Sequence, residues 1–223
     1  MTRPDSVFDS GAAQGYFLLL LACGAGLLFS IPAGAHVNDL MESSWKPSPL
    51  VFHLTYITLL GLLGTFRGIA GARWEGPVWG RLAHLALHVL FGQLIVLPYL
   101  FFSRALLPGR GPVLPLLAVY TTVAAFAFAL IAFRLERWGQ SRRVHTFMHQ
   151  YALLALILVV PWALGMLSGV PDAVGLLSPI GAGLRIIEPG SAAELAVAFA
   201  FVLIVLLIQI LAIRRSTRRN HGV

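Results

Sequence analysis

The chain has 223 residues, of which 58% are hydrophobic and 11% are charged, and its mean hydropathy is +0.83. A soluble domain of this size needs far more charge to cover its surface, so the composition excludes an ordinary water-soluble protein. The net charge of +7 does not indicate a nucleic-acid partner, because the basic residues lie between long apolar runs, as in membrane proteins. The single cysteine, Cys23, excludes an internal disulfide framework and a cysteine-rich metal site.

Six apolar runs approach the length that crosses a bilayer, about 20 helical residues. Because lipid offers backbone groups no hydrogen-bond partner, each run must form a helix or belong to a closed barrel. Continuous runs such as Leu195 to Ile213 lack the alternation of barrel strands. The sequence therefore predicts an all-α, polytopic membrane protein with one transmembrane domain over residues 1–223. The predicted spans are about 15–35, 50–70, 82–107, 113–133, 147–169 and 193–213.

The distribution of Lys and Arg predicts that both termini are cytoplasmic. With the N-terminus inside, the inner segments carry twelve basic residues and the outer segments carry four. Basic loops favour the cytoplasmic side of a membrane. The polar segment Met1 to Gln14 contains Asp5 and Asp9, so we expect no cleavable signal peptide. The expected location is a cell membrane, with the bacterial inner membrane as the specific expectation.

No Asp, Glu, Lys or Arg falls clearly in the middle of a predicted span. Charges at such positions usually mark ion pathways and proton relays. Their absence argues against a proton-driven transporter or a pump. It is compatible with a subunit that moves passively with a partner, and with a haem carrier.

The stretch from Gly165 to Glu194 is rich in glycine and proline, yet it contains two apolar pieces, Ala173 to Leu177 and Ile180 to Ile187. Neither piece is long enough to span a bilayer. Such segments are typical of re-entrant or interfacial structure. We expect this one on the outer side, between spans five and six; an ordinary structured loop is the alternative.

Histidines form two pairs with i, i+4 spacing, one at the cytoplasmic end of predicted span three and one at that of span five: His84 with His88, and His145 with His149. This spacing places both rings of a pair on one helix face. Neutral imidazoles on facing helices are what a b-type haem iron needs. His88 and His149 are the deeper members and the candidate axial ligands.

The same four histidines are compatible with two further roles. Four imidazoles from two helices could hold zinc, copper or iron instead of haem. Interfacial histidines also commonly form hydrogen bonds across helices or meet lipid headgroups. Elsewhere in the chain, His36 and His53 could form a weaker second site on the outer side.

The chain contains no Gly-x-Ser-x-Gly, no His-Glu-x-x-His and no phosphate-binding Gly-x-x-x-x-Gly-Lys motif, so it does not bind ATP through a Walker loop of its own. Ser168 and Ser178 have no evident base beside them. The arginine-rich loop from Arg134 to Arg143 orients the chain in the membrane; docking of an acidic partner or anionic lipid is its alternative role.

From about Gly92 to the C-terminus, the chain resembles the permease subunit of a type-2 ABC exporter. The resemblance rests on the Leu97-Pro98 pair that ends span three, the Val160-Pro161 pair in span five, and Leu177-Ser178-Pro179 in the outer segment before span six. A basic inner loop and a basic tail complete the pattern. Family members place re-entrant helices between spans five and six, where this chain has its apolar, glycine-rich stretch.

The resemblance implies a dimer of permease protomers, no cofactor bound by this chain, and a separate ATP-binding subunit. Such a subunit would contact the inner loop between spans two and three. Arg73-Trp74-Glu75-Gly76 is similar to a reduced form of the acidic coupling motif of the family. The coupling residues implied are Arg73, Trp74, Glu75 and Arg81.

A second resemblance is to membrane cytochrome b subunits, including the ferric-reductase-like group. It rests on the histidines of spans three and five and on Arg142-Arg143-Val-His145. It implies haem b bound by His88 and His149, with redox subunits and quinone as partners. Phe101 and Trp162 stand thirteen residues beyond those histidines, where a second pair would be expected, so at most one haem is implied. The permease is the favoured function and the haem subunit the second; assembly factors and membrane scaffolds are the remaining classes.

Overall fold

A computed structural model of the chain describes residues 10–29, 50–103, 113–142, 160, 164, 172–187 and 192–220. Within these ranges the secondary structure is helical, and no strand occurs. The helices are α1 (Ser10–Phe29), α2 (Leu50–Arg73), α3 (Val78–Ser103), α4 (Val113–Arg142), the short 3₁₀ helix η2 (Asp172–Leu177), α6 (Pro179–Ile187) and α7 (Ala192–Asn220).

Four helices in the described ranges are long and apolar enough to cross a membrane: Phe52–Arg73, Val78–Ser103, Val113–Gln140 and Ala193–Arg215. The apolar part of α1, Ala12–Leu28, is shorter. The prediction of an all-helical protein with several membrane-spanning helices is therefore confirmed.

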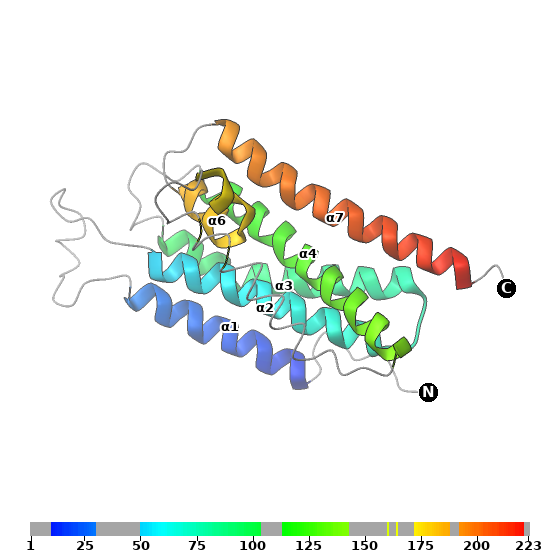
Figure 1. The fold of residues 1–223 in the computed structure, drawn as a ribbon. Helices are drawn as coiled ribbons and strands as arrows, with labels where there is room; N and C mark the ends of the chain where they lie inside the picture. The colour runs from blue at the N-terminus through cyan, green and yellow to red at the C-terminus, as the bar shows by residue number, and fades with distance from the viewer. Residues whose placement is uncertain are drawn as a thin grey trace, which may run out of the picture.

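The long helices lie side by side, and their contacts fix their directions (Figure 1). α1 and α3 run the same way, because Tyr16 meets His88 near one end and Gly24 faces Tyr99 near the other. α2, α4 and α7 run the opposite way. Figure 1 places the start of α1 and the end of α7 at the same end of the bundle.

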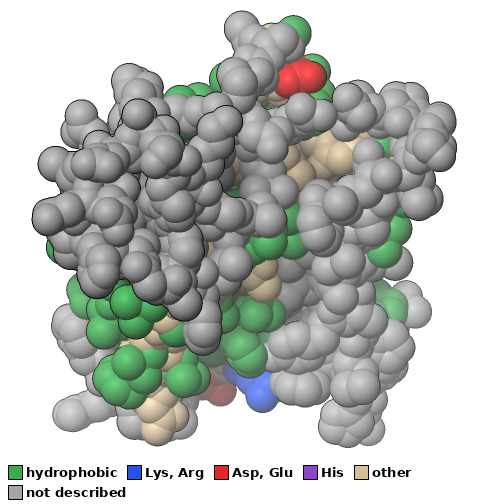
Figure 2. Space-filling view, turned by 90° about the vertical axis from the view of Figure 1, so that its left-hand side faces the viewer, with side chains coloured by type: hydrophobic (Ala, Val, Ile, Leu, Met, Phe, Trp, Pro, Cys, Tyr) green, Lys and Arg blue, Asp and Glu red, His purple; other side chains and the backbone are tan. Residues whose placement is uncertain are grey.

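We name the two ends of the bundle by the features found there. The turn end holds residues 74–77, which join α2 to α3, and the last residues of α4 and α7. The hairpin end holds η2 and α6 (Figure 1). Figure 2 looks onto the hairpin end, where the described surface is mostly hydrophobic with few charged side chains.

Among the helices that the structure describes, α2 and α4 lie at the centre and pack on each other most extensively. Glycines on α2 allow this approach: a Cβ on Gly64 would collide with the carbonyl oxygen of Ala125, and one on Gly68 with that of Ala129. Small residues let helix backbones come close where lipid gives no hydrophobic driving force. α7 contacts α4 and leaves most of its apolar surface exposed.

η2 and α6 form a compact helical hairpin on the hairpin end. Ser178 begins α6 as its N-cap, since its Oγ accepts a hydrogen bond from the N–H of Ile180 at 3.2 Å. α6 packs against α2 and α4, with Gly183 facing Ile57 and Leu117. Thus the two apolar pieces of this stretch form packed helices rather than an extended loop. Their depth in a membrane stays a prediction.

The observed boundaries differ from the predicted spans mainly where polar residues continue a helix. α1 begins at Ser10 rather than at residue 15, and α3 begins at Val78 rather than 82. α4 and α7 extend to Arg142 and Asn220, because a helix can continue beyond the apolar run that defines a span. Of the predicted span 147–169, the structure describes only Val160 and Leu164, both helical.

Candidate functional site

The α2–α3 turn brings the most distinctive polar and aromatic residues together. α2 ends at Arg73, and Trp74, Glu75, Gly76 and Pro77 follow before α3 begins. Proline suits the entry to a helix, because it lacks the N–H group that would go unsatisfied there. The N–H of Arg81 donates to the carbonyl of Pro77 at 3.1 Å. The chain thereby reverses, and the last turns of α2 face the first turns of α3.

Arg81 is buried and holds this turn closed. Its Nη1 donates to the carbonyl oxygens of Trp74, at 2.9 Å, and of Ala72, at 3.4 Å. These carbonyls end α2 and lack partners within the helix. The guanidinium also lies over the ring of Phe133 on α4, with Cζ 5.4 Å from the ring centroid. Arg81 therefore links α2, α3 and α4.

Arg73 links the end of α2 to α4. Its Nε donates to Oε1 of Glu136 at 2.8 Å, and the Glu136 side chain is buried while that of Arg73 is 61% exposed. Glu75 is exposed and Trp74 is half-buried. Of the four predicted coupling residues, Arg73 and Arg81 thus make contacts inside the chain, and Glu75 is the most available to a partner. Their coupling role stays a prediction.

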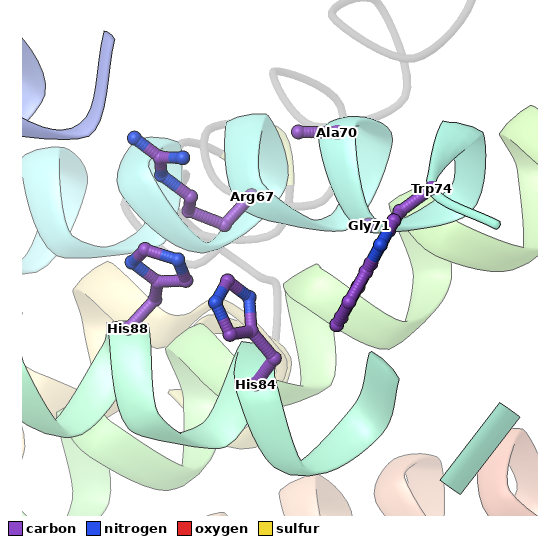
Figure 3. A pocket seen from close by; sticks show the side chains of 6 residues that line it. All are labelled: Arg67, Ala70, Gly71, Trp74, His84 and His88. Atoms are coloured by element: carbon purple, nitrogen blue, oxygen red, sulfur yellow. The ribbon is translucent and has the colours of Figure 1, made fainter. Parts of the chain in front are cut away.

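His84 and His88 point from α3 towards α2, on one helix face as the spacing predicts (Figure 3). His88 is buried, and a hydrogen bond joins its Nδ1 to the hydroxyl of Tyr16 on α1, with the donor set by the imidazole tautomer. His84 is half-buried between Trp74 and His88, with ring centroids 5.1 and 4.5 Å away. The other predicted pair, His145 and His149, lies outside the described residues.

A hollow separates α2 from α3 beside these histidines. It is lined by Arg67, Ala70, Gly71, Trp74, His84 and His88, and measures about 290 Å³ including the part open to the outside (Figure 3). The part of the hollow that a water molecule could occupy measures about 20 Å³, room for about one water. The His84 and His88 rings pack against each other at this edge of α3. No cluster of three or more metal-binding side chains occurs within the described ranges.

A second group of polar side chains lies in the bundle core. Tyr56 donates to Oε1 of Gln93 at 2.6 Å and also contacts the hydroxyl of Thr121. Thr121 in turn donates to the carbonyl of Leu117 at 2.8 Å. The group joins α2, α3 and α4 but pairs no nucleophile with a base, so its evident role is to hold these helices in register.

Sequence reasoning missed Tyr16 and Arg67 as parts of the site. Tyr16 stands at the start of an apolar run, and Arg67 has the pattern of an ordinary basic residue in an inner segment. No local pattern places them beside His84 and His88, because the Tyr16–His88 bond and the hollow that Arg67 lines both depend on how the helices pack. Searches for related proteins found no matching family model, and no curated protein or solved structure with detectable similarity.

Proposed function

We propose that the chain is the membrane-embedded permease subunit of an ABC-type export complex, in which a separate chain binds and hydrolyses ATP. The observation that carries this proposal is the η2–α6 hairpin, which packs on α2 and α4 at one end of the bundle and directly precedes the last helix. The type-2 ABC permeases that the sequence resembles have re-entrant helices at this point. The lack of a phosphate-binding loop in residues 1–223 assigns nucleotide binding to another chain.

The proposal includes six spans, a bacterial inner membrane, and a turn end that faces the cytoplasm. α4 ends at the turn end and η2 begins at the hairpin end, which leaves room for the predicted fifth span, 147–169, between them. Among the described basic residues only Arg185 belongs to the hairpin. The others lie towards the turn end: Arg67, Arg73, Arg81, Arg134, Arg137, Arg142, Arg214, Arg215, Arg218 and Arg219. A basic cytoplasmic side supports this orientation.

In this complex a second permease protomer would complete the path for the substrate, and the ATP-binding subunit would dock on the turn end. Glu75 is the exposed acidic residue of the turn, and Trp74 lies half-buried beside it. A subunit that contacts this turn would transmit movement to both α2 and α3, since Arg81 ties the turn to each of them. The turn is therefore the place to test coupling.

Two measurements test the proposal: co-purification of a partner ATPase, and the loss of that ATPase when a charge at the turn is reversed. Affinity purification of the full chain from its native membrane should recover an ATPase with a phosphate-binding loop. Glu75→Lys should lower the co-purified ATPase activity about tenfold or more, because like charges opposed at an interface cost several kcal/mol. Glu194→Lys, which reverses a charge at the hairpin end, is the matched control. Full transport activity without any ATPase would refute the proposal.

The alternative is a haem b-binding redox subunit, in which His88 and His149 would be the axial ligands. A reduced-minus-oxidised difference spectrum of the purified protein separates the two. The permease proposal expects no haem band. If a band is present, His88→Ala should abolish it and His84→Ala should weaken it less, since His88 is the more deeply buried of the two.

A further inference from the structure

α7 lies at the edge of the bundle and is the least buried of the four long apolar helices in the described ranges (Figure 1). Buried residues make up 17% of its most apolar stretch, against 39–61% in the other three helices. Its main contacts are with α4, η2 and α6. One face of α7 is therefore open to whatever surrounds the bundle. Five large aliphatic side chains on this face are 42–56% exposed: Leu203, Ile204, Leu207, Ile208 and Leu211.

Two exposed arginines, Arg214 and Arg215, continue the same face at the turn end. Successive residues of an α-helix are about 100° apart around its axis. On this basis each arginine lies within about 20° of two of the aliphatic residues: Arg214 of Leu203 and Leu207, and Arg215 of Ile204 and Ile208. The face is thus apolar along most of its length and cationic at one end. We call residues 203–215 on this side of the helix the α7 face.

The length and the charge of the α7 face match a phospholipid of one leaflet. From Leu203 to Arg214 the helix rises roughly 16 Å, close to half of the ~30 Å hydrocarbon core of a bilayer. An acyl chain that lies along the aliphatic side chains would therefore bring its headgroup to the arginines. The chain has no Asp or Glu after Glu194, which stands at the far end of α7, so this end of the helix offers the arginines no carboxylate.

We propose that the α7 face binds an anionic phospholipid of the leaflet at the turn end. A guanidinium matches a phosphate group through two parallel hydrogen bonds. Long arginine side chains near the end of a membrane helix extend towards the headgroups. Another helix is a poorer occupant, because helix contacts in a membrane favour small residues and this face is built from leucine and isoleucine. The inference needs only that α7 crosses a membrane, so it is independent of the export proposal.

A fluorescent reporter on the α7 face tests which lipid lies there. The buried Cys23 would be replaced by alanine, and Leu207→Cys would carry the fluorophore. The full chain would be reconstituted in vesicles with equal amounts of phosphatidylglycerol and phosphatidylcholine, one of the two brominated on its acyl chains, since bromine quenches a fluorophore on contact. Quenching should show a preference for phosphatidylglycerol of about tenfold or more, because each arginine near an anionic lipid surface contributes about fivefold.

Variants separate this site from general attraction to a basic surface. Arg214→Gln should lower the preference about fivefold, and Arg215→Gln, a second variant of the face, should do the same. Arg134→Gln is the matched control at the same end of the bundle and should change the preference less than about twofold. The Arg134 guanidinium donates to Oε1 of Gln209 at 3.3 Å, and Gln209 lies on the opposite side of α7 from the α7 face.

Three results would each overturn the proposal. Equal quenching by the two brominated lipids would mean that the α7 face meets lipid without selecting a headgroup. Absence of quenching by either lipid would mean that protein, such as a second copy of the chain, covers the face. An equal loss of preference in Arg214→Gln and Arg134→Gln would assign the effect to the total charge of the turn end.

Discussion

Buried polar side chains decide how the turn end is held together. Arg81 satisfies carbonyl oxygens at the end of α2 and at the same time lies over Phe133. The Tyr16–His88 hydrogen bond attaches α1 to the same region. Leaving a buried donor or acceptor without its partner costs more free energy than the hydrogen bond itself contributes to stability. Substitution of any one of these residues should therefore give a measurable loss of stability.

Tyr16→Phe should lower the free energy of unfolding by about 1–3 kcal/mol, because it removes the hydroxyl that meets buried Nδ1 of His88. Unfolding would be followed by far-UV circular dichroism during denaturant titration in detergent micelles. Tyr99→Phe, at a half-buried tyrosine on α3, is the matched control and should cost less. Equal losses in both variants would mean that the Tyr16 hydroxyl contributes nothing specific.

Arg81→Lys keeps the charge but loses the planar group that reaches two carbonyls and covers Phe133. It should destabilise the protein by about 1–2 kcal/mol, the value of one or two hydrogen bonds from a charged group. Arg134→Lys, at an exposed position on α4, should be nearly neutral. Thermal unfolding of both variants in the same detergent gives the comparison. A neutral Arg81→Lys variant would contradict a structural role for Arg81.

At the scale of helices, close contact between α2 and α4 organises the bundle. The two backbones approach where Gly64 faces Ala125 and Gly68 faces Ala129. α6 then packs on both helices at the hairpin end. Because α2 also contacts α1 and α3, a change in the α2–α4 distance would move every helix packed on α2.

Gly64→Ala should destabilise the bundle by about 1–3 kcal/mol, because the added methyl group would collide with the Ala125 carbonyl oxygen. Gly61→Ala, one turn earlier on the same helix, is the control: its Cβ would meet Phe128 at 3.4 Å, an ordinary contact. Alanine favours a helix over glycine, so the control should be neutral or slightly stabilising. Unfolding midpoints measured in detergent would rank the two variants. The reverse order would refute the close α2–α4 approach.

At the scale of the whole molecule, the long helices run in two opposite directions, and the proposed topology puts the two ends of the bundle on opposite sides of a membrane. α1 and α3 run one way while α2, α4 and α7 run the other. The position of the turn end, inside or outside the cell, then fixes the orientation of the whole chain. The basic residues concentrated there support a cytoplasmic turn end.

Cysteine labelling in intact cells tests the proposed orientation. The native Cys23 is buried and would be replaced by alanine to give a background that does not react. A cysteine at Gln140 or Thr217, both at the turn end, should resist a membrane-impermeant maleimide until the cells are permeabilised. A cysteine at Ala193, exposed at the start of α7, should react in intact cells. Labelling at 140 or 217 in intact cells would reverse the orientation.

Local patterns in the sequence predict much of the observed fold. Apolar run length predicts the helices α2, α3, α4 and α7, because a membrane span needs a fixed length of apolar helix. The glycine and proline content with short apolar pieces predicts a separate segment before the last span, and the structure shows η2 and α6 before α7. The i, i+4 spacing places His84 and His88 on one face. Each of these properties depends on residues close together in the chain.

What the sequence by itself determined is the helical, membrane-embedded class of the protein, the identity of its main spans and the excess of basic residues near one end. Only the tertiary structure decided that Tyr16 meets His88, that Arg81 closes the turn against Phe133, and that Arg67 lines the same hollow as the two histidines. The physical reason is that hydropathy and helix periodicity are set locally along the chain. The partner of a buried polar group depends on which helices pack together and in which direction. This packing is determined jointly by residues that are far apart in the sequence.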